Sequence, residues 1–294
     1  MDMLTDVIGV LRTGRPVAAR VGWRAPWAQR FERVPGASGF HVVVRGEAWL
    51  VPDDDPPVRL RQGDVVFLPD GRGHVLADAV STPVTAQACA PGSRVAYEQP
   101  EAPTTVTLCG AYELGTVHPM LRGSSATVHR GGPDLLRTAG LLADELESPG
   151  PGSAALVPGL LDALLVYLLR AWFESSPDRR GWVAALRDRA LAPALHAIHR
   201  SPGSPWTVAS LAGETGMSRA AFAERFTHFM RQPPMAYLTW WRLVTAAKLL
   251  RDTDVPLSTV AREVGYGSQF AFATAFKREH GIPPGRFRRA MFER

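Results

Sequence analysis

Cysteine is scarce in this sequence: its 294 residues include only Cys89 and Cys109. Two cysteines build no disulfide framework and no metal-ligand cluster. The chain also lacks the basic start, long apolar run and small-residue cleavage site of a secretion signal. Its longest apolar stretch, residues 154–169, is interrupted by Pro158 and Asp162 and is shorter than the roughly 20 residues that span a bilayer. We therefore expect a soluble, cytoplasmic protein with no membrane partner.

Charge is present but unevenly distributed. The whole chain has 33 Lys and Arg against 28 Asp and Glu, for a net charge of +5. Residues 1–175 hold 15 basic and 19 acidic residues, whereas residues 176–294 hold 18 and 9. The length and the 46% apolar content favour two domains with packed cores. The basic C-terminal part favours a polyanion such as nucleic acid, although a solvated basic surface is the ordinary alternative.

Residue composition and hydrophobic periodicity divide the sequence into three parts. Residues 17–128 contain short β-branched and aromatic runs between Gly, Pro and Asp, such as FHVVVRGEAWLV and VRLRQGDVVFLP, which is typical of a sandwich or barrel of short strands. From Pro133 apolar residues recur at three and four positions, which predicts two amphipathic helices. A linker is predicted at 174–181, and the remainder has helical periodicity broken by Pro and Gly.

An internal repeat occupies the helical C-terminal part. One copy reads LAGETGMSRAAFAERFTHFMRQPPMAYL and the other VAREVGYGSQFAFATAFKREHGIPPGRF, with Gly267 as the one inserted residue. Each copy has the layout of a helix-turn-helix, in which Gly allows a tight bend and Ser caps the second helix. The matched pairs are Gly216 with Gly265, Ser218 with Ser268, Phe222 with Phe272, Phe226 with Phe276, and Pro233-Pro234 with Pro283-Pro284.

The second helix of each copy has an inner and an outer face. The two Phe residues of each copy lie at i and i+4, so we expect them to pack on the first helix. The outer face suits a major groove, since Arg can bind guanine, Gln can bind adenine, and Ala or Phe can contact the thymine methyl. Nearby basic residues, namely Lys277, Arg278, Arg286, Arg288 and Arg289, could hold phosphates. The predicted DNA-binding residues are Arg219, Ala220, Ala223, Glu224 and Thr227 in the first copy and Gln269, Phe270, Ala273, Thr274 and Lys277 in the second.

A long helix is predicted between the two copies, over residues 235–252. At 1.5 Å per residue it would be roughly 25 Å long. It could hold the two recognition helices about 34 Å apart, near one turn of duplex, so that both enter successive major grooves. One chain would then read two short boxes.

The stretch from about Pro205 to Phe292 closely resembles the AraC/XylS-type transcription regulators. Its characteristic segments are WTVASLAGETGMSRAAFAERF, YLTWWRLVTAAKLL, VAREVGYGSQFAFATAFKREHG and the closing PPGRFRR. The resemblance implies bipartite DNA binding through residues 218–229 and 268–280. The sequence departs from the family where Glu224 and Thr274 replace a commonly basic residue and where Arg231 replaces a common Gly.

The N-terminal part resembles the cupin-type effector domain of many such regulators. GDVVFLPDGRGHVLAD, residues 63–78, fits the second cupin motif through His74, with Asp78 where Asn is usual, and FHVVVRGEAWLV fits the end of the first. The paired histidines and glutamate of the first motif, expected within 31–40, are absent. A divalent metal in an enzyme typically needs three or more protein ligands, and His74 has only His41 as a possible partner. No metal or other cofactor is therefore expected.

Four residues of this N-terminal part keep two interpretations each. His41 and His74 could bind a small effector inside the barrel or could satisfy backbone groups in a strand-rich core. Cys109 could be a packed thiol, or Cys89 and Cys109 could form a redox sensor, which needs an exposed thiol of low pKa and a resolving partner.

The expected fold is an α+β multidomain chain. Residues 1–130 form a cupin-like β-barrel that senses a signal, residues 131–175 a helical connector for homodimerisation, and residues 176–294 an all-α tandem helix-turn-helix domain. The resemblance implies a transcription regulator rather than an enzyme, with double-stranded DNA and a small-molecule effector as partners and RNA polymerase as a further one. The competing hypotheses are a redox-responsive regulator, a cupin-type metalloenzyme with a DNA-binding tail, and a constitutive DNA-binding protein whose barrel only dimerises.

Overall fold

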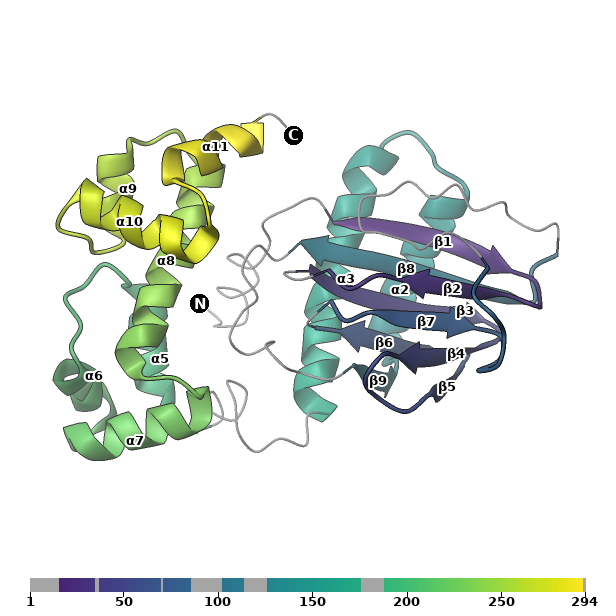
Figure 1. Cartoon of the computed structure of the whole chain (residues 1–294), viewed down its shortest axis with the longest axis horizontal. Coiled ribbons are helices and arrows are strands. Elements are labelled where there is room, and N and C mark those ends of the chain that lie inside the picture. The colour runs from purple at the N-terminus through teal and green to yellow at the C-terminus, as the bar shows by residue number, and fades with distance from the viewer. Residues whose placement is uncertain are drawn as a thin grey trace. The chain divides into compact units, whose positions relative to one another are not determined.

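The structure is a computed structural model of the 294-residue chain and describes residues 16–34, 37–69, 71–85, 102–113, 126–175 and 188–292. The described residues form two compact units (Figure 1). The barrel unit contains the described residues up to 175, and the helical unit contains residues 188–292.

The barrel unit is built from two antiparallel sheets. Among the described residues, a five-stranded sheet has the order β1-β8-β3-β6-β9 and a four-stranded sheet has the order β2-β7-β4-β5. This arrangement agrees with the strand-rich pattern of the N-terminal sequence. The strands are β1 (Val17–Trp23), β2 (Ala28–Phe31), β3 (Ala37–Arg45), β4 (Glu47–Pro52), β5 (Val58–Arg61), β6 (Asp64–Leu68), β7 (His74–Ala77), β8 (Thr105–Glu113) and β9 (Thr127–Arg130).

An apolar core fills the space between the two sheets. Successive strand residues point to opposite faces, so each strand contributes alternate residues to this core. Trp23 and Trp27 stack in it with ring centroids 4.4 Å apart, and the Trp23 indole N–H donates to the Thr107 hydroxyl over 2.8 Å. The buried core residues are Val21, Trp23, Trp27, Val43, Ala48, Leu50, Leu60, Val66, Leu68, Leu76 and Cys109.

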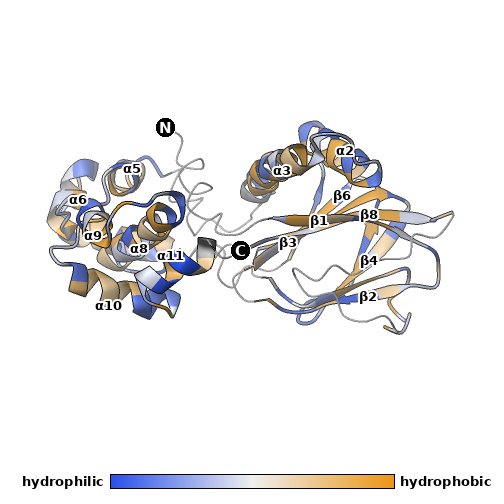
Figure 2. Ribbon diagram, turned by 90° about the horizontal axis from the view of Figure 1, so that it is seen from above, coloured by the Kyte–Doolittle hydropathy of each residue, from blue (hydrophilic) through white to orange (hydrophobic). Residues whose placement is uncertain are grey.

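Two helices, α2 (Pro133–Glu147) and α3 (Ser153–Ser175), cover the outer face of the five-stranded sheet (Figure 2). The Tyr112 hydroxyl of β8 donates to the Leu161 carbonyl of α3 over 2.7 Å, and the rings of Phe67 and Trp172 meet edge to face. These helices therefore belong to the same compact unit as the strands.

Helix α3 is longer than the apolar run in the sequence indicates. It continues through Pro158, and its segment Ser153–Trp172 is long and apolar enough to cross a membrane by length and composition alone. The expectation that this segment is too short was wrong. The helix nevertheless contacts the sheet through Leu161 and Trp172. Leu164, Leu165 and Leu168 are buried, although only 28% of the Ser153–Trp172 segment is buried as a whole.

The helical unit contains both copies of the sequence repeat. Figure 1 shows the two helix-turn-helix motifs, α6-α7 and α9-α10, at the two ends of the central helix α8. At 1.5 Å per residue its 19 residues span about 28 Å. The helices are α5 (Ala192–Arg200), α6 (Val208–Thr215), α7 (Arg219–Met230), α8 (Pro234–Asp252), α9 (Leu257–Glu263), α10 (Gln269–His280) and α11 (Pro284–Phe292).

Candidate nucleic-acid interface and the buried histidine pair

The two recognition helices begin in the same way. Ser218 and Ser268 have extended backbones, and their hydroxyls accept the backbone N–H groups of Ala221 and Ala271. Such a cap satisfies one of the free N–H groups that open a helix. The predicted caps are confirmed in both copies.

The inner faces of α7 and α10 are held by equivalent aromatic contacts. Phe222 and Phe226 of α7 are fully buried, as are Phe272 and Phe276 of α10. The Phe226 ring meets Tyr237 of α8 at 5.7 Å, and Phe276 meets Phe287 of α11 at 5.3 Å. Tyr237 and Phe287 lie 50 positions apart, the spacing of the repeat after its turn, so the repeat extends into the helix that follows each motif. Both recognition helices are thus fixed by one packing scheme.

The outer faces carry the residues predicted to bind DNA. The first position of each helix, Arg219 and Gln269, is exposed, and Phe270 is 83% exposed. The Phe270 ring is therefore available to contact a ligand. Most of the other predicted residues are also exposed, namely Ala220, Glu224, Thr227, Thr274 and Lys277. Ala223 and Ala273 are half-buried.

The two threonines use their hydroxyl protons within their own helices. Thr227 donates to the Ala223 carbonyl over 2.7 Å, and Thr274 donates to the Phe270 carbonyl over 3.0 Å. In these rotamers each side chain can accept a hydrogen bond from a ligand or touch it with its methyl group. They are weaker candidates for base reading than Arg219 and Gln269.

The basic residues near the motifs fall into two groups. Lys277, Arg278, Arg286 and Arg289 are exposed and remain candidates to hold phosphates. Arg288 is half-buried, and its Nη2 donates to the Val255 carbonyl over 2.7 Å. This guanidinium ties α11 to the turn before α9, which makes Arg288 a weaker candidate for a phosphate contact than the four exposed residues.

Two structural interactions of the helical unit escaped the sequence reasoning. Arg225 of α7 donates from Nε and Nη2 to Asp188 Oδ2, at 3.1 and 2.5 Å. These hydrogen bonds, together with the N–H groups of Ala190 and Leu191, keep the pKa of Asp188 below its ordinary value against the opposing effect of its burial. The partners lie 37 residues apart in the sequence, so no local pattern could have found them.

The second interaction joins His199 of α5 to α8. Its ring stacks on Trp241 at 3.8 Å, and its Nε2 lies 2.7 Å from the Tyr237 hydroxyl. Burial lowers the pKa of His199 to about 3. A neutral histidine therefore joins α5 to α8 in the core of the helical unit.

The barrel unit brings His41 and His74 together. Both side chains are buried, and their Nε2 atoms lie 2.7 Å apart. Phe31 contacts both rings, stacking on His74 at 4.9 Å and meeting His41 at 4.8 Å. Burial lowers the pKa of His74 to about 4, and burial with the neighbouring His74 lowers the pKa of His41 well below its usual range. Both rings are neutral near neutral pH.

The hydrogen bonds of this pair define its tautomers. His74 Nδ1 lies 3.0 Å from the Arg72 carbonyl oxygen, which only accepts, so Nδ1 carries the proton of this neutral ring. His74 Nε2 is then the acceptor, and His41 Nε2 donates to it. His41 Nδ1 is consequently an acceptor, and it has no hydrogen-bond partner among the described residues. The pair therefore satisfies the Arg72 carbonyl and leaves His41 Nδ1 as an acceptor without a donor among the described residues.

The donor set does not fit the metal that many cupins hold. Two imidazole nitrogens bound to one tetrahedral ion, each at about 2.0–2.1 Å, would lie more than 3 Å apart, whereas these two lie at hydrogen-bond distance. In the described part of the barrel unit no third His, Cys, Asp or Glu completes a ligand group with them. The two histidines, as they are placed, do not fit a metal ion.

Of the two predicted redox cysteines, Cys109 lies among the described residues and Cys89 lies outside them. Cys109 is buried, with 8% of its surface exposed, and its sulfur lies 3.3 Å from the Thr107 hydroxyl. A redox-sensing thiol is accessible to its oxidant. The burial of Cys109 favours the packed interpretation.

Comparison with known proteins defines the class. A cupin family model matches residues 2–174, and a helix-turn-helix family model matches residues 211–290. The chain belongs to the AraC-type transcription regulators that combine a cupin domain with a helix-turn-helix domain. It is therefore a DNA-binding regulator of transcription, and the AraC/XylS resemblance is confirmed.

Relatives of this class match almost the whole chain. AraC-like transcription regulators of Streptomyces lividans and Streptomyces antibioticus are each 33% identical over 302 residues, covering 98% of this chain and 98% and 99% of their own lengths. The HTH-type transcriptional regulator AlkR of Acinetobacter baylyi is 30% identical over 307 residues, covering 98% of this chain and 99% of its own.

Proposed function

We propose that one chain reads two short DNA boxes, one through α7 and the other through α10. The matching outer faces of these helices carry the proposal: in both copies a Ser cap and two buried Phe residues leave the same positions exposed. The exposed side chains differ between the copies, because Arg219 and Ala220 of α7 correspond to Gln269 and Phe270 of α10. The two boxes therefore differ in sequence.

Each proposed contact follows from the chemistry of a base edge. Arg219 donates two hydrogen bonds to guanine, Gln269 pairs with adenine, and Phe270 packs on a thymine methyl group. The exposed Lys277, Arg278, Arg286 and Arg289 hold phosphates, which set the register without reading sequence. Glu224 lies on the outer face of α7, where it accepts from cytosine or excludes other bases.

The barrel unit receives the signal in this proposal, and we expect a small molecule as the effector. Two copies of the chain associate in the cytoplasm, with α2 and α3 available for the contact: Leu141 and Leu156 are exposed on them. A small-molecule signal is favoured over a redox signal because Cys109 is buried. Contact with RNA polymerase is a further part of the proposal, and we assign no enzymatic activity to the chain.

The spacing between the boxes tests this function. Since α8 is a continuous helix that fixes the distance between the two motifs, inserting about five base pairs, half a turn of duplex, should turn the second box to the opposite face of the DNA. Affinity should then fall to that of a single box, and Gln269→Ala should weaken binding to the original DNA but not to the DNA with the insertion. An affinity that does not change with the insertion would show that only one motif contacts DNA.

A further inference from the structure

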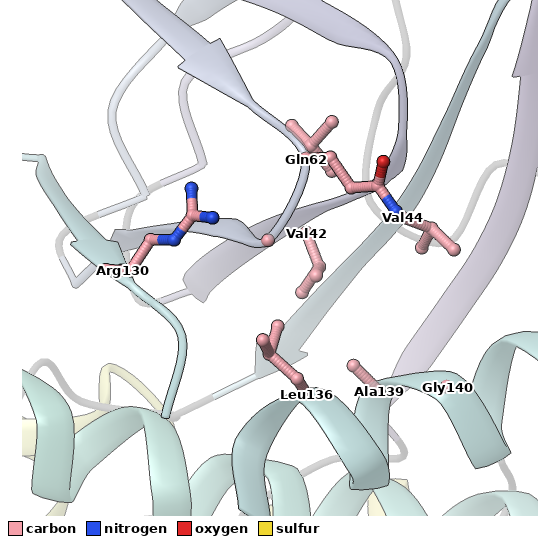
Figure 3. A pocket seen from close by; sticks show the side chains of 9 residues that line it. Val42, Val44, Gln62, Arg130, Leu136, Ala139 and Gly140 are labelled. Carbon is pink, nitrogen blue, oxygen red and sulfur yellow. The ribbon is translucent and has the colours of Figure 1, made fainter. Parts of the chain in front are cut away.

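A cleft of about 420 Å³ lies outside the barrel core, between α2 and the outer face of β3 (Figure 3). Its volume is within the usual range for small-molecule sites. The cleft belongs entirely to the barrel unit. It is lined by Val42, Val43, Val44, Gln62, Gly63, Arg130, Leu136, Ala139 and Gly140.

Both ends of α2 contact other parts of the barrel unit. Near its start, Leu136 packs closely on the backbone: a Cβ added at Gly131 would lie only 2.6 Å from Leu136 Cδ2. At its end, Glu147 forms an ion pair with Arg20 of β1 at 2.8 Å. Between these contacts, a Cβ added at Gly140 would meet no atom within 4 Å. Glycine weakens a helix interior, yet here it leaves space above the sheet.

The strand that forms the floor of the cleft is irregular. The pairing of β3 with β8 shifts register between Val43 and Arg45. On the side of β6, the Val43 carbonyl accepts the backbone N–H of Gly63 over 2.9 Å. Such bulges occur preferentially at sheet edges and beside functional sites. Val44, which lies at this irregularity, lines the cleft beside the Gln62 side chain (Figure 3).

Arg130 is the cationic residue among those that line the cleft. The Arg130 side chain is 70% exposed, and its Nη1 lies 3.3 Å from Asp64 Oδ1. Its Nε and Nη2 have no hydrogen-bond partner in the described part of the chain, and the guanidinium group lies against Gly63, within 4 Å of where a Cβ would be. The Gln62 amide is exposed on the other side of the cleft. Two free N–H groups on one guanidinium match the two oxygens of a carboxylate.

We propose that this cleft binds a small carboxylate with a compact apolar body. The carboxylate pairs with Arg130 Nε and Nη2, and the apolar body lies on Val42, Leu136 and Ala139. The binding of a carboxylate here does not depend on the proposed function. Only the further step, that this carboxylate is the signal received by the barrel unit, rests on it. The core between the sheets is the less suitable site, because stacked tryptophans and aliphatic side chains fill it.

Binding of cyclohexanecarboxylate to the full chain, measured by titration calorimetry at millimolar concentration, tests the site. Cyclohexanecarboxamide has the same body without the charge. Arg130→Gln should weaken binding of the carboxylate about tenfold or more, the range for hydrogen bonds to charged groups, and should leave binding of the amide unchanged. Gly140→Leu should fill the cleft and abolish binding of both compounds.

Gly159→Leu is the matched control for Gly140→Leu. Gly159 lies inside α3, and a Cβ there would also meet no atom within 4 Å, so both variants gain the same helix propensity. Gly159→Leu should bind the carboxylate as the unaltered chain does. The proposal is overturned if the unaltered chain does not bind the carboxylate, if Gly140→Leu still binds it, or if Arg130→Gln weakens both compounds equally.

DNA binding measured on the same variants separates this proposal from the proposed function. Gly140→Leu should still bind the two-box DNA, because the cleft contains no residue of the helical unit. Loss of carboxylate binding with intact DNA binding then supports the cleft. Bound carboxylate should also change the affinity of the unaltered chain for that DNA and have no such effect on Gly140→Leu. Binding without any effect on DNA affinity would overturn the assignment of the carboxylate as the signal.

Discussion

Lowering the pH from about 7 to about 5 should destabilise the barrel unit through its buried histidines. Above its ordinary pKa of 6.5, His74 is neutral whether the chain is folded or unfolded, so it adds no pH dependence. Below that value the unfolded chain binds a proton, whereas folded His74 stays neutral until the pH reaches about 4. Stability is therefore lost as the pH falls between these two values.

The size of this loss follows from the difference between the two pKa values. Each unit of pKa difference corresponds to about 1.4 kcal/mol, so by about pH 5 the loss from His74 should reach about 2 kcal/mol. His41, whose pKa is also lowered by burial, adds to the loss in the same direction. A double variant, His41→Leu with His74→Leu, should lack this acid sensitivity, because neither buried imidazole is then present to bind a proton on unfolding.

Urea unfolding of the unaltered chain and of the double variant at the two pH values measures the difference. The single variant His74→Leu should be less stable at neutral pH by about 1–3 kcal/mol, since His41 Nε2 would keep a buried N–H without an acceptor. Replacing the exposed His228 by Leu is the control, and it should lose as much stability in acid as the unaltered chain. If the double variant loses as much as the unaltered chain, the neutral buried pair is refuted.

Three further predictions concern the helical unit. Arg231 ends α7 with a φ of 55°, so Arg231→Gly should raise the free energy of unfolding by up to about 1 kcal/mol, and an unchanged or lower value would contradict a strained backbone. In thermal melts, Gly265→Ala should destabilise the chain far more than Gly216→Ala. Both glycines have positive φ, but of the two only Gly265 would place a Cβ within 2.8 Å of other atoms. Equal losses of stability would show that the positive φ, and not the close contact, determines the cost of the substitution. Arg225→Gln should weaken binding to the first box by about tenfold, the effect of losing a charged hydrogen bond that positions α7, with little change at the second; equal loss at both boxes would mean a general loss of folding.

The sequence predicts most of the helical unit because its signals are local. A serine followed by two phenylalanines four residues apart gives both the start and the buried face of each recognition helix. The copy-to-copy match then identifies Phe270 as exposed, since its equivalent is Ala220. These inferences need only helical periodicity.

The remaining features depend on contacts between distant segments. His41 and His74 lie 33 residues apart and become a hydrogen-bonded pair only because two sheets face each other. The cleft under α2 depends on Gly140 lying opposite a bulge in β3, and neither feature has a sequence pattern of its own. The same holds for Arg288, whose charge predicted a phosphate contact but whose guanidinium group binds a backbone carbonyl.

Selection of bound sequences from a random DNA library tests the central claim most directly. The unaltered chain should select two different boxes about one helical turn apart. Arg219→Ala should relax the preference at one base of the first box, and Gln269→Ala at one base of the second, each losing about 1–3 kcal/mol of discrimination. If both variants select the same two boxes with uniformly weaker binding, these residues do not read bases, and the division of recognition between α7 and α10 is wrong.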